Sequence, residues 1–121
     1  MQTYHIGDRD FTLDELVLDQ EEALAQILAP LYEEGEMTVK GLVDALVRKG
    51  LLRKALSVLL VPAGETVETA NREDTERYIG PRMTLSQQAR VIRDFFDVNA
   101  GAVNAIKGLA TMAPGAEGST I

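Results

Sequence analysis

The chain has 121 residues, of which 45% are hydrophobic and 26% are charged, and its formal net charge is −7. These values are typical of one globular domain. Because cysteine is absent, the composition excludes disulfide bonds, thiolate metal sites and cysteine nucleophiles. The longest apolar stretch, residues 55–62, falls well short of the roughly 20 residues that a bilayer span needs, and the first residues lack the pattern of an export signal. We therefore expect a cytoplasmic protein without a membrane partner.

The charge is unevenly distributed along the chain. Residues 1–36 hold ten acidic and one basic side chain, residues 37–61 hold one acidic and five basic, and residues 62–121 hold eight acidic and six basic. Nucleic-acid binding requires a concentrated positive face. The basic middle segment is short and has no interleaved aromatic residues, so we expect it to be a solvated helix flank and expect no nucleic-acid partner.

The first predicted element is a β-hairpin over about residues 2–13. Tyr4, Ile6, Phe11 and Leu13 follow the period of two that gives a strand one buried face. Residues 7–10 (GDRD) suit a turn, because Gly and Asp tolerate turn conformations. A lone hairpin is marginally stable in water, so it must pack on the helices or on another chain.

Three helices are predicted next. The first begins near Asp19 or Gln20 and should kink or break at Pro30. The second is capped by Thr38 and stops at Gly50, which suits a left-handed C-terminal residue. The third covers residues 51–61 and has a wide apolar face.

The rest of the chain is predicted to be a loop over residues 62–82 with a short helix at 71–79, and then further helices. Thr84 and Gln87 match a capping box that starts a helix ending near Val98. Asn99 could end that helix and cap a last one carrying apolar residues at 103, 106 and 109. The sequence thus predicts a mainly α fold, a small bundle of four to six helices with an N-terminal hairpin, in one domain over 1–112 with a flexible tail over 113–121.

The sequence offers little for catalysis. His5 is the single histidine, and a metal site usually needs three or four ligands. The paired glutamates at 21–22 and 33–34 lie at predicted helix ends, where water reaches them, and not in a pocket that would shift a pKa. The glycines lack the spacing of a phosphate loop. We therefore predict a non-enzymatic protein without a metal or other cofactor.

Two apolar features could bind a partner. The first is the adjacent pair Phe95 and Phe96, which point about 100° apart on a helix, so that both lie in the core or one faces outward. The second is the apolar face of residues 51–61 together with that of Leu42 and Leu46. Both features could also be ordinary core, but wide apolar faces in so short a chain suggest a groove or a dimer seam. The candidate partner-binding residues are Leu52, Leu56, Leu59, Leu60, Phe95 and Phe96.

Several segments resemble one protein family. Residues 6–20 (IGDRDFTLDELVLDQ) contain a hairpin of the type IGDxxFTL followed by an LxLxQ step. Residues 59–64 (LLVPAG), 85–89 (LSQQA) and 91–99 (VIRDFFDVN) continue the likeness in scattered pieces between residues 4 and 110. This order of segments resembles the tail assembly chaperones of long-tailed, siphovirus-like bacteriophages.

The resemblance implies a phage or prophage tail assembly chaperone. Such a protein acts in the host cytoplasm, binds the tape measure protein, helps to recruit tail tube subunits and is not part of the mature virion. Chaperones of this kind are often also made in a longer, frameshifted form. The alternatives are a structural virion protein, such as a head–tail connector or a tail terminator, and an unrelated bacterial helical adaptor. A homo-oligomer is also left open.

Overall fold

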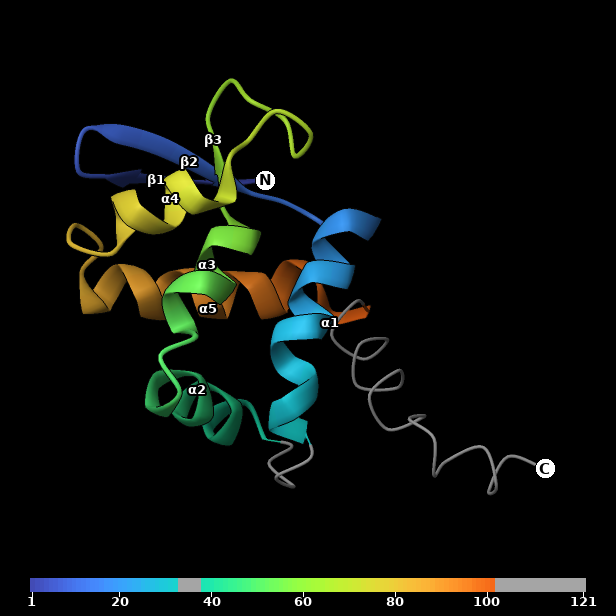
Figure 1. The fold of residues 1–121 in the computed structure, drawn as a ribbon. Helices are drawn as coiled ribbons and strands as arrows, with labels where there is room; N and C mark the ends of the chain where they lie inside the picture. Colours follow the sequence, from blue (N-terminus) through green and yellow to red (C-terminus); the bar gives the residue numbers. More distant parts are fainter. Residues whose placement is uncertain (33–37, 102–121) are drawn as a thin grey trace.

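A computed structural model describes residues 1–32 and 38–101. In chain order the elements are β1 (Gln2–Ile6), β2 (Arg9–Leu13), α1 (Leu18–Tyr32), α2 (Val39–Arg48), α3 (Leu52–Leu59), β3 (Val61–Pro62), α4 (Arg72–Ile79) and α5 (Leu85–Val98). In Figure 1 the small sheet lies at the top of the molecule, with α4 next to it and the other helices below. The predicted mainly α fold with an N-terminal hairpin is confirmed. The predicted last helix and the tail over 113–121 lie outside the described residues.

The hairpin has the predicted buried face but a tighter turn. Tyr4, Ile6, Phe11 and Leu13 are all buried. The pairing of Ile6 with Arg9 leaves only residues 7 and 8 between the strands, so the expectation that residues 9 and 10 belong to the turn was wrong. Gly7 has a φ of 65°, a left-handed conformation that a two-residue hairpin turn often requires and that glycine adopts at low cost.

A third strand completes the sheet and was not predicted. The sheet order is β1-β2-β3, and the short β3 pairs with β2 in antiparallel register, Phe11 with Pro62 and Thr12 with Val61. The helix predicted over residues 51–61 therefore ends earlier, at Leu59. Pro62 can occupy this place because β3 is an edge strand, where a missing N–H donor costs little.

The helix ends follow the predicted chemistry in most places. The Thr38 hydroxyl accepts the N–H of Gly41, and Thr84 and Gln87 form the expected capping box. After α2 the chain turns at Gly50, which has a φ of 70°. The N–H of Leu51 then donates to the carbonyl of Leu46 at 2.8 Å, as in a left-handed helix stop. The helix α1 is not broken at Pro30 but continues to Tyr32.

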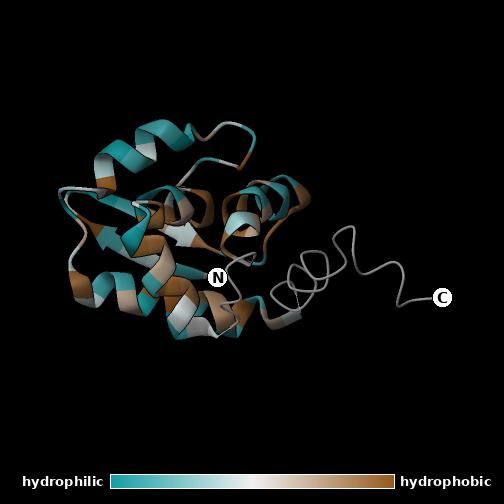
Figure 2. Ribbon diagram, turned by 60° about the horizontal axis from the view of Figure 1, so that its bottom comes forward, coloured by the Kyte–Doolittle hydropathy of each residue, from teal (hydrophilic) through white to brown (hydrophobic). Residues whose placement is uncertain are grey.

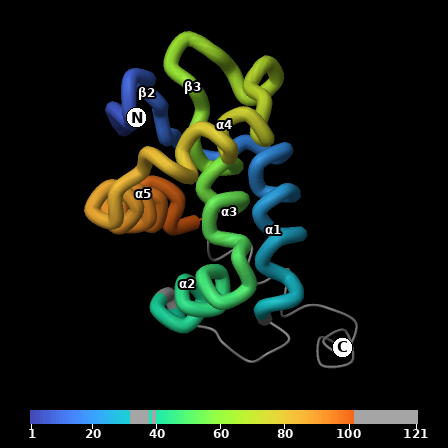
Figure 3. Tube along the Cα trace, turned by 60° about the vertical axis from the view of Figure 1, so that its left-hand side comes forward, coloured from blue at the N-terminus to red at the C-terminus, as the bar shows by residue number. Residues whose placement is uncertain are grey.

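The helix α3 lies in the middle of the fold. In Figure 3 it runs between α1 and α5, and it makes contacts with α1, α2 and α4. Five consecutive residues, 55–59, are therefore buried on it. Hydrophobic residues cluster toward the centre of the molecule, and hydrophilic residues cover much of the outside (Figure 2). A helix packed on several sides uses a wide apolar face for the core, which leaves little of that face for a partner.

Two buried amides join the start of α1 to the rest of the fold. The Asn99 side chain, 2% exposed, accepts the N–H of Leu16 at 2.7 Å and donates to the carbonyl of Asp14 at 3.3 Å. The Gln20 side chain accepts the N–H of Val17 at 3.1 Å and donates to the carbonyl of Val58 at 2.9 Å. Asn99 ends α5 as predicted, and its side chain fixes the β2–α1 connection.

The hairpin turn is held against α4 by Tyr78. Its hydroxyl accepts the N–H of Asp8 at 2.8 Å and donates to the Asp8 carboxylate. The Arg9 and Arg82 guanidinium groups each lie 4.3 Å from the centre of the Tyr78 ring, a distance at which cations attract aromatic rings. The hydrogen bond from Tyr78 lowers the pKa of the Asp8 carboxyl. Tyr78 therefore fastens the hairpin turn to α4, and its contacts are called the hairpin clamp here.

The N-terminal strand is fastened to α5 in a similar way. The Tyr4 hydroxyl donates to the Asp94 carboxylate at 2.7 Å, and Arg90 lies 4.9 Å from the Tyr4 ring centre. Burial and the hydrogen bond to Asp94 raise the pKa of Tyr4 well above its ordinary value. The hairpin thus packs on the helices of its own chain, one of the two outcomes that the sequence left open.

Candidate functional site: an apolar groove beside α3

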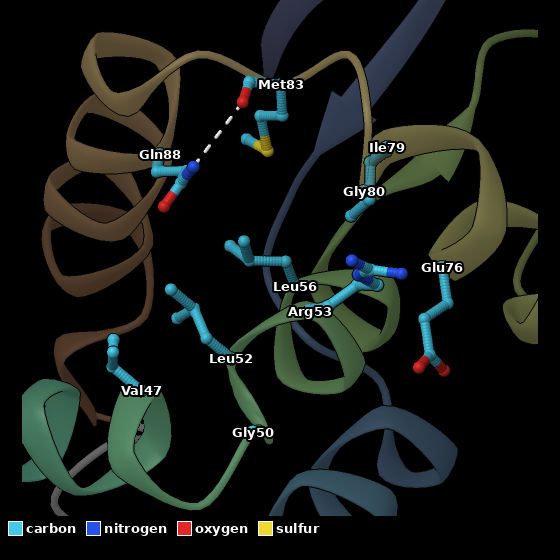
Figure 4. Close-up of a pocket in the computed structure, with 10 residues that line it drawn as sticks. All are labelled: Val47, Gly50, Leu52, Arg53, Leu56, Glu76, Ile79, Gly80, Met83 and Gln88. Carbon is cyan, nitrogen blue, oxygen red and sulfur yellow. Dashed lines mark hydrogen bonds between the residues drawn. The ribbon is translucent and has the colours of Figure 1, made fainter.

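A hollow of about 380 Å³ opens between the α2–α3 connection, α3, α4 and α5. Its lining residues are Val47, Gly50, Leu52, Arg53, Leu56, Glu76, Ile79, Gly80, Met83 and Gln88. In Figure 4, the side chains of Leu52, Leu56 and Met83 point into the space between α3 and α5. Here this hollow is called the groove.

The groove has an apolar interior and a polar edge. Leu56, Ile79 and Met83 are buried and form part of the core, while Leu52 is half-buried and Val47 is exposed. The edge carries Arg53, Glu76 and Gln88, and the Gln88 amide donates to the carbonyl of Met83 at 3.4 Å. An apolar centre with a polar rim is the usual anatomy of a protein–protein contact surface. A methionine in such a place adapts its shape to different side chains.

Two glycines shape this groove. Gly50 ends the turn after α2 and so places Val47 and Leu52 on either side of the connection. Gly80 follows α4, and a Cβ atom there would lie 2.5 Å from the Cζ atom of Arg53. The guanidinium group of Arg53 therefore lies directly against the Gly80 backbone. The missing side chain at Gly80 leaves room for this cation at the groove wall.

Arg53 has no carboxylate partner among the described residues. Its side chain forms no salt bridge or hydrogen bond with any residue in 1–32 or 38–101, although Glu76 also lines the groove. The adjacent Lys54 lines a different hollow, of about 440 Å³, between α1, α3 and α4. That hollow carries more charged side chains, among them Arg72, Glu73 and Glu76. Fewer of the described residues that line the groove are therefore charged.

The six predicted partner-binding residues differ in how far a partner can reach them. Leu52 and Leu56 both line the groove. Leu56, Leu59, Leu60 and Phe95 are all buried in the core, so a partner reaches at most the edge of Leu56. Phe96 is half-buried, and its ring meets that of Phe95 edge-on at 5.1 Å between centres. The apolar surface available to a partner is therefore smaller than the sequence indicated, because α3 is surrounded by other elements.

Sequence reasoning missed several groove residues. Val47 lies on the exposed side of α2, Ile79 ends the short helix predicted over residues 71–79, and Met83 follows the loop predicted over residues 62–82. Arg53 was counted only as part of a basic flank. These residues meet because of the turns at Gly50 and Gly80. The available signal in the sequence was a turn glycine between two apolar stretches. A turn glycine does not indicate, however, in which direction the second stretch leaves the turn.

Few of the described groove residues carry a charge. Among the described residues that line the groove, only Arg53 and Glu76 are charged. In the described part of the chain no group of three or more His, Cys, Asp or Glu side chains could hold a metal ion. No helix within residues 1–32 and 38–101 is long and apolar enough to cross a membrane. The arrangement is suited to holding apolar side chains of another polypeptide.

Comparison of the chain with protein-family models, with curated proteins and with solved structures gives no match.

Proposed function

We propose that this protein is a non-catalytic tail assembly chaperone of a phage or prophage, which binds the tape measure protein through the groove. In this proposal it acts in the host cytoplasm, helps to recruit tail tube subunits and is absent from the mature virion. The observation that carries the proposal is the open apolar groove with its polar rim. The likeness of residues 6–20 and of the later segments to that chaperone family supplies the identity of the partner.

The groove suits an apolar segment of another chain. A helix lying in such a groove inserts side chains spaced three or four residues apart. Leu52 and Leu56 are themselves one turn apart on α3, and Met83 faces them from the connection between α4 and α5. A long helical partner exposes many such side chains before it is assembled. Covering them with an acidic domain, of net charge −7, keeps the complex soluble.

The test is co-purification of the tagged chain with the tape measure protein encoded in the same phage or prophage genome. The variant Leu52→Asp places a charge in the groove at a half-buried position, and should reduce recovery of the tape measure protein by about tenfold or more. Leu85→Asp is the matched control, since Leu85 is 79% exposed and does not line the groove. Both variants should retain the wild-type circular dichroism spectrum.

Equal recovery with both folded variants would refute the groove as the contact site. Mass spectrometry of purified particles provides the second arm of the test. A chaperone is absent from particles, whereas a connector or tail terminator is present in a fixed number of copies. A chain that binds neither the tape measure protein nor particles would be an unrelated helical adaptor.

A further inference from the structure

The start of α1 presents two apolar side chains to solvent. Val17 is 49% exposed and Leu18 is 68% exposed, although the neighbouring Leu16 is buried. Both residues lie next to each other where the chain passes from β2 into α1. We call these two adjacent exposed side chains, Val17 and Leu18, the α1 knob.

The α1 knob is held in a fixed position. The N–H of Val17 donates to the buried Gln20 side chain, and the N–H of Leu16 donates to the buried Asn99 side chain. The backbone on both sides of the knob is thereby tied to the core. A preorganised projection loses little conformational freedom when it binds, which favours association.

The residues around the knob are acidic, whereas the groove holds charges of both signs. The exposed acidic residues beside the knob are Asp14, Glu15, Asp19 and Glu22, and no basic residue occurs between positions 10 and 39. The groove holds Arg53 at its wall, without a salt bridge to any described residue, and Glu76 at its edge. The acidic residues beside the knob are therefore complementary to Arg53, a groove cation that forms no salt bridge within the described residues.

We propose that the groove of one copy binds the α1 knob of a second copy. In this contact Leu18 enters the space lined by Leu52 and Met83, and Arg53 faces the carboxylates of Asp19 or Glu22. The knob lies at the start of α1, which contributes no described residue to the lining of the groove, and Figure 3 shows α1 and α5 on different sides of α3. The contact is therefore heterologous, with different surfaces meeting, and it can repeat from copy to copy into open chains unless the rotation closes a ring.

The inference uses the groove of the proposed function but does not rest on the tape measure protein. Self-association is measured with the purified chain alone. If the chain does not self-associate, the proposal that it binds the tape measure protein still stands. If it does not bind that protein, the proposal of self-association still stands. Where both occur, the two ligands compete, and the tape measure protein should dissociate the self-associated chains.

The experiment is sedimentation velocity of the purified chain over a range of concentrations. The wild type should form species larger than a monomer as its concentration rises, and added NaCl should weaken them because salt screens charge pairs. Arg53→Glu and Leu18→Ser should each raise the dissociation constant by about tenfold or more. Lys54→Glu makes the same charge change on α3 outside the groove, and Leu85→Ser removes another exposed leucine at the first residue of a helix.

The heterologous arrangement gives a sharper test. Arg53→Glu spoils the groove but leaves the knob intact, whereas Leu18→Ser spoils the knob but leaves the groove intact. Each variant alone should therefore be monomeric at concentrations where the wild type associates. An equimolar mixture should contain one intact contact and form a dimer that grows no further.

Three results would overturn the inference. The first is a wild-type chain that remains monomeric at every concentration. The second is association that Arg53→Glu and Leu18→Ser, both folded, do not weaken beyond their matched controls. The third is a mixture of these two variants that stays monomeric, because a knob that fits the groove must restore one contact.

Discussion

Replacing Asn99 with alanine tests how the start of α1 is attached to the fold. Asn99 Oδ1 lies 2.7 Å from the Leu16 nitrogen, and both residues are buried. The truncation leaves that N–H without its acceptor in a place that water does not reach easily. An unsatisfied buried donor costs about 1–3 kcal/mol. The second bond, to the exposed Asp14 at 3.3 Å, is long, and water can replace it.

The expected loss for Asn99→Ala is therefore about 2–3 kcal/mol of the free energy of unfolding, including the small void left by the amide. Urea unfolding followed by circular dichroism measures it. With an m-value of about 1.3 kcal/mol per molar urea for a chain of this size, the midpoint should fall by about 2 M. The m-value itself should not change, since the same surface is exposed on unfolding.

Asn71→Ala is the matched control for this change. Asn71 caps α4, where its side chain accepts the N–H of Asp74 at 3.1 Å, but it is exposed. Loss of an exposed cap costs about 1 kcal/mol, which is less than 1 M in the urea midpoint. If both asparagine variants lose equal stability, burial of the Asn99 side chain does not matter and the reasoning is refuted.

The remaining predictions concern the hairpin clamp, two glycines and the core. Tyr78→Phe removes the hydrogen bond that lowers the pKa of Asp8, so that pKa should rise toward 3.8 in a carboxyl NMR titration; an unchanged value would contradict the clamp. Because the Asp8 pKa is lower in the folded than in the unfolded chain, it stabilises the fold above the unfolded-state pKa, and this stabilisation is lost as the pH falls through the folded-state pKa. Tyr78→Phe lacks this contribution, so the variant should lose less stability than the wild type between pH 4 and acid unfolding. Gly50→Ala should lower the free energy of unfolding by about 1 kcal/mol or more, because the φ of Gly50 is 70°. Gly80→Ala meets only the flexible end of a side chain and should cost less in the same urea unfolding experiment. A larger loss for Gly80→Ala than for Gly50→Ala would contradict this reasoning. Leu56→Asp should unfold the chain, as seen by loss of the helical circular dichroism signal, because Leu56 is 4% exposed; a folded variant would place Leu56 outside the core.

Local patterns predicted most of the fold. The alternation of Tyr4, Ile6, Phe11 and Leu13 predicted the buried hairpin face, because strand side chains alternate between two faces whatever packs on them. The capping residues Thr38 and Thr84 predicted helix starts, because a cap bonds within its own first turn. These features depend on neighbours in the sequence, and the structure confirms them.

The features that depend on distant contacts could not be predicted in this way. The strand β3 exists because Val61 and Pro62 meet β2, about fifty residues earlier in the chain. Similarly, the wide apolar face of α3 does not show how many elements will cover it. Leu59 and Leu60 read as spare apolar surface in the sequence, yet α1, α2 and α4 all pack on α3. The groove was accordingly located only in part, through Leu52 and Leu56.

The most direct test of the central claim is methyl NMR of the folded chain with the tape measure protein. The claim is that the groove is the surface on which the partner binds. Val47, Leu52 and Met83 all carry methyl groups in the groove, and their signals should shift or broaden most, while the methyl groups of Leu85 should change little. Changes confined to methyl groups outside the groove, or no changes with a partner that binds, would contradict the account.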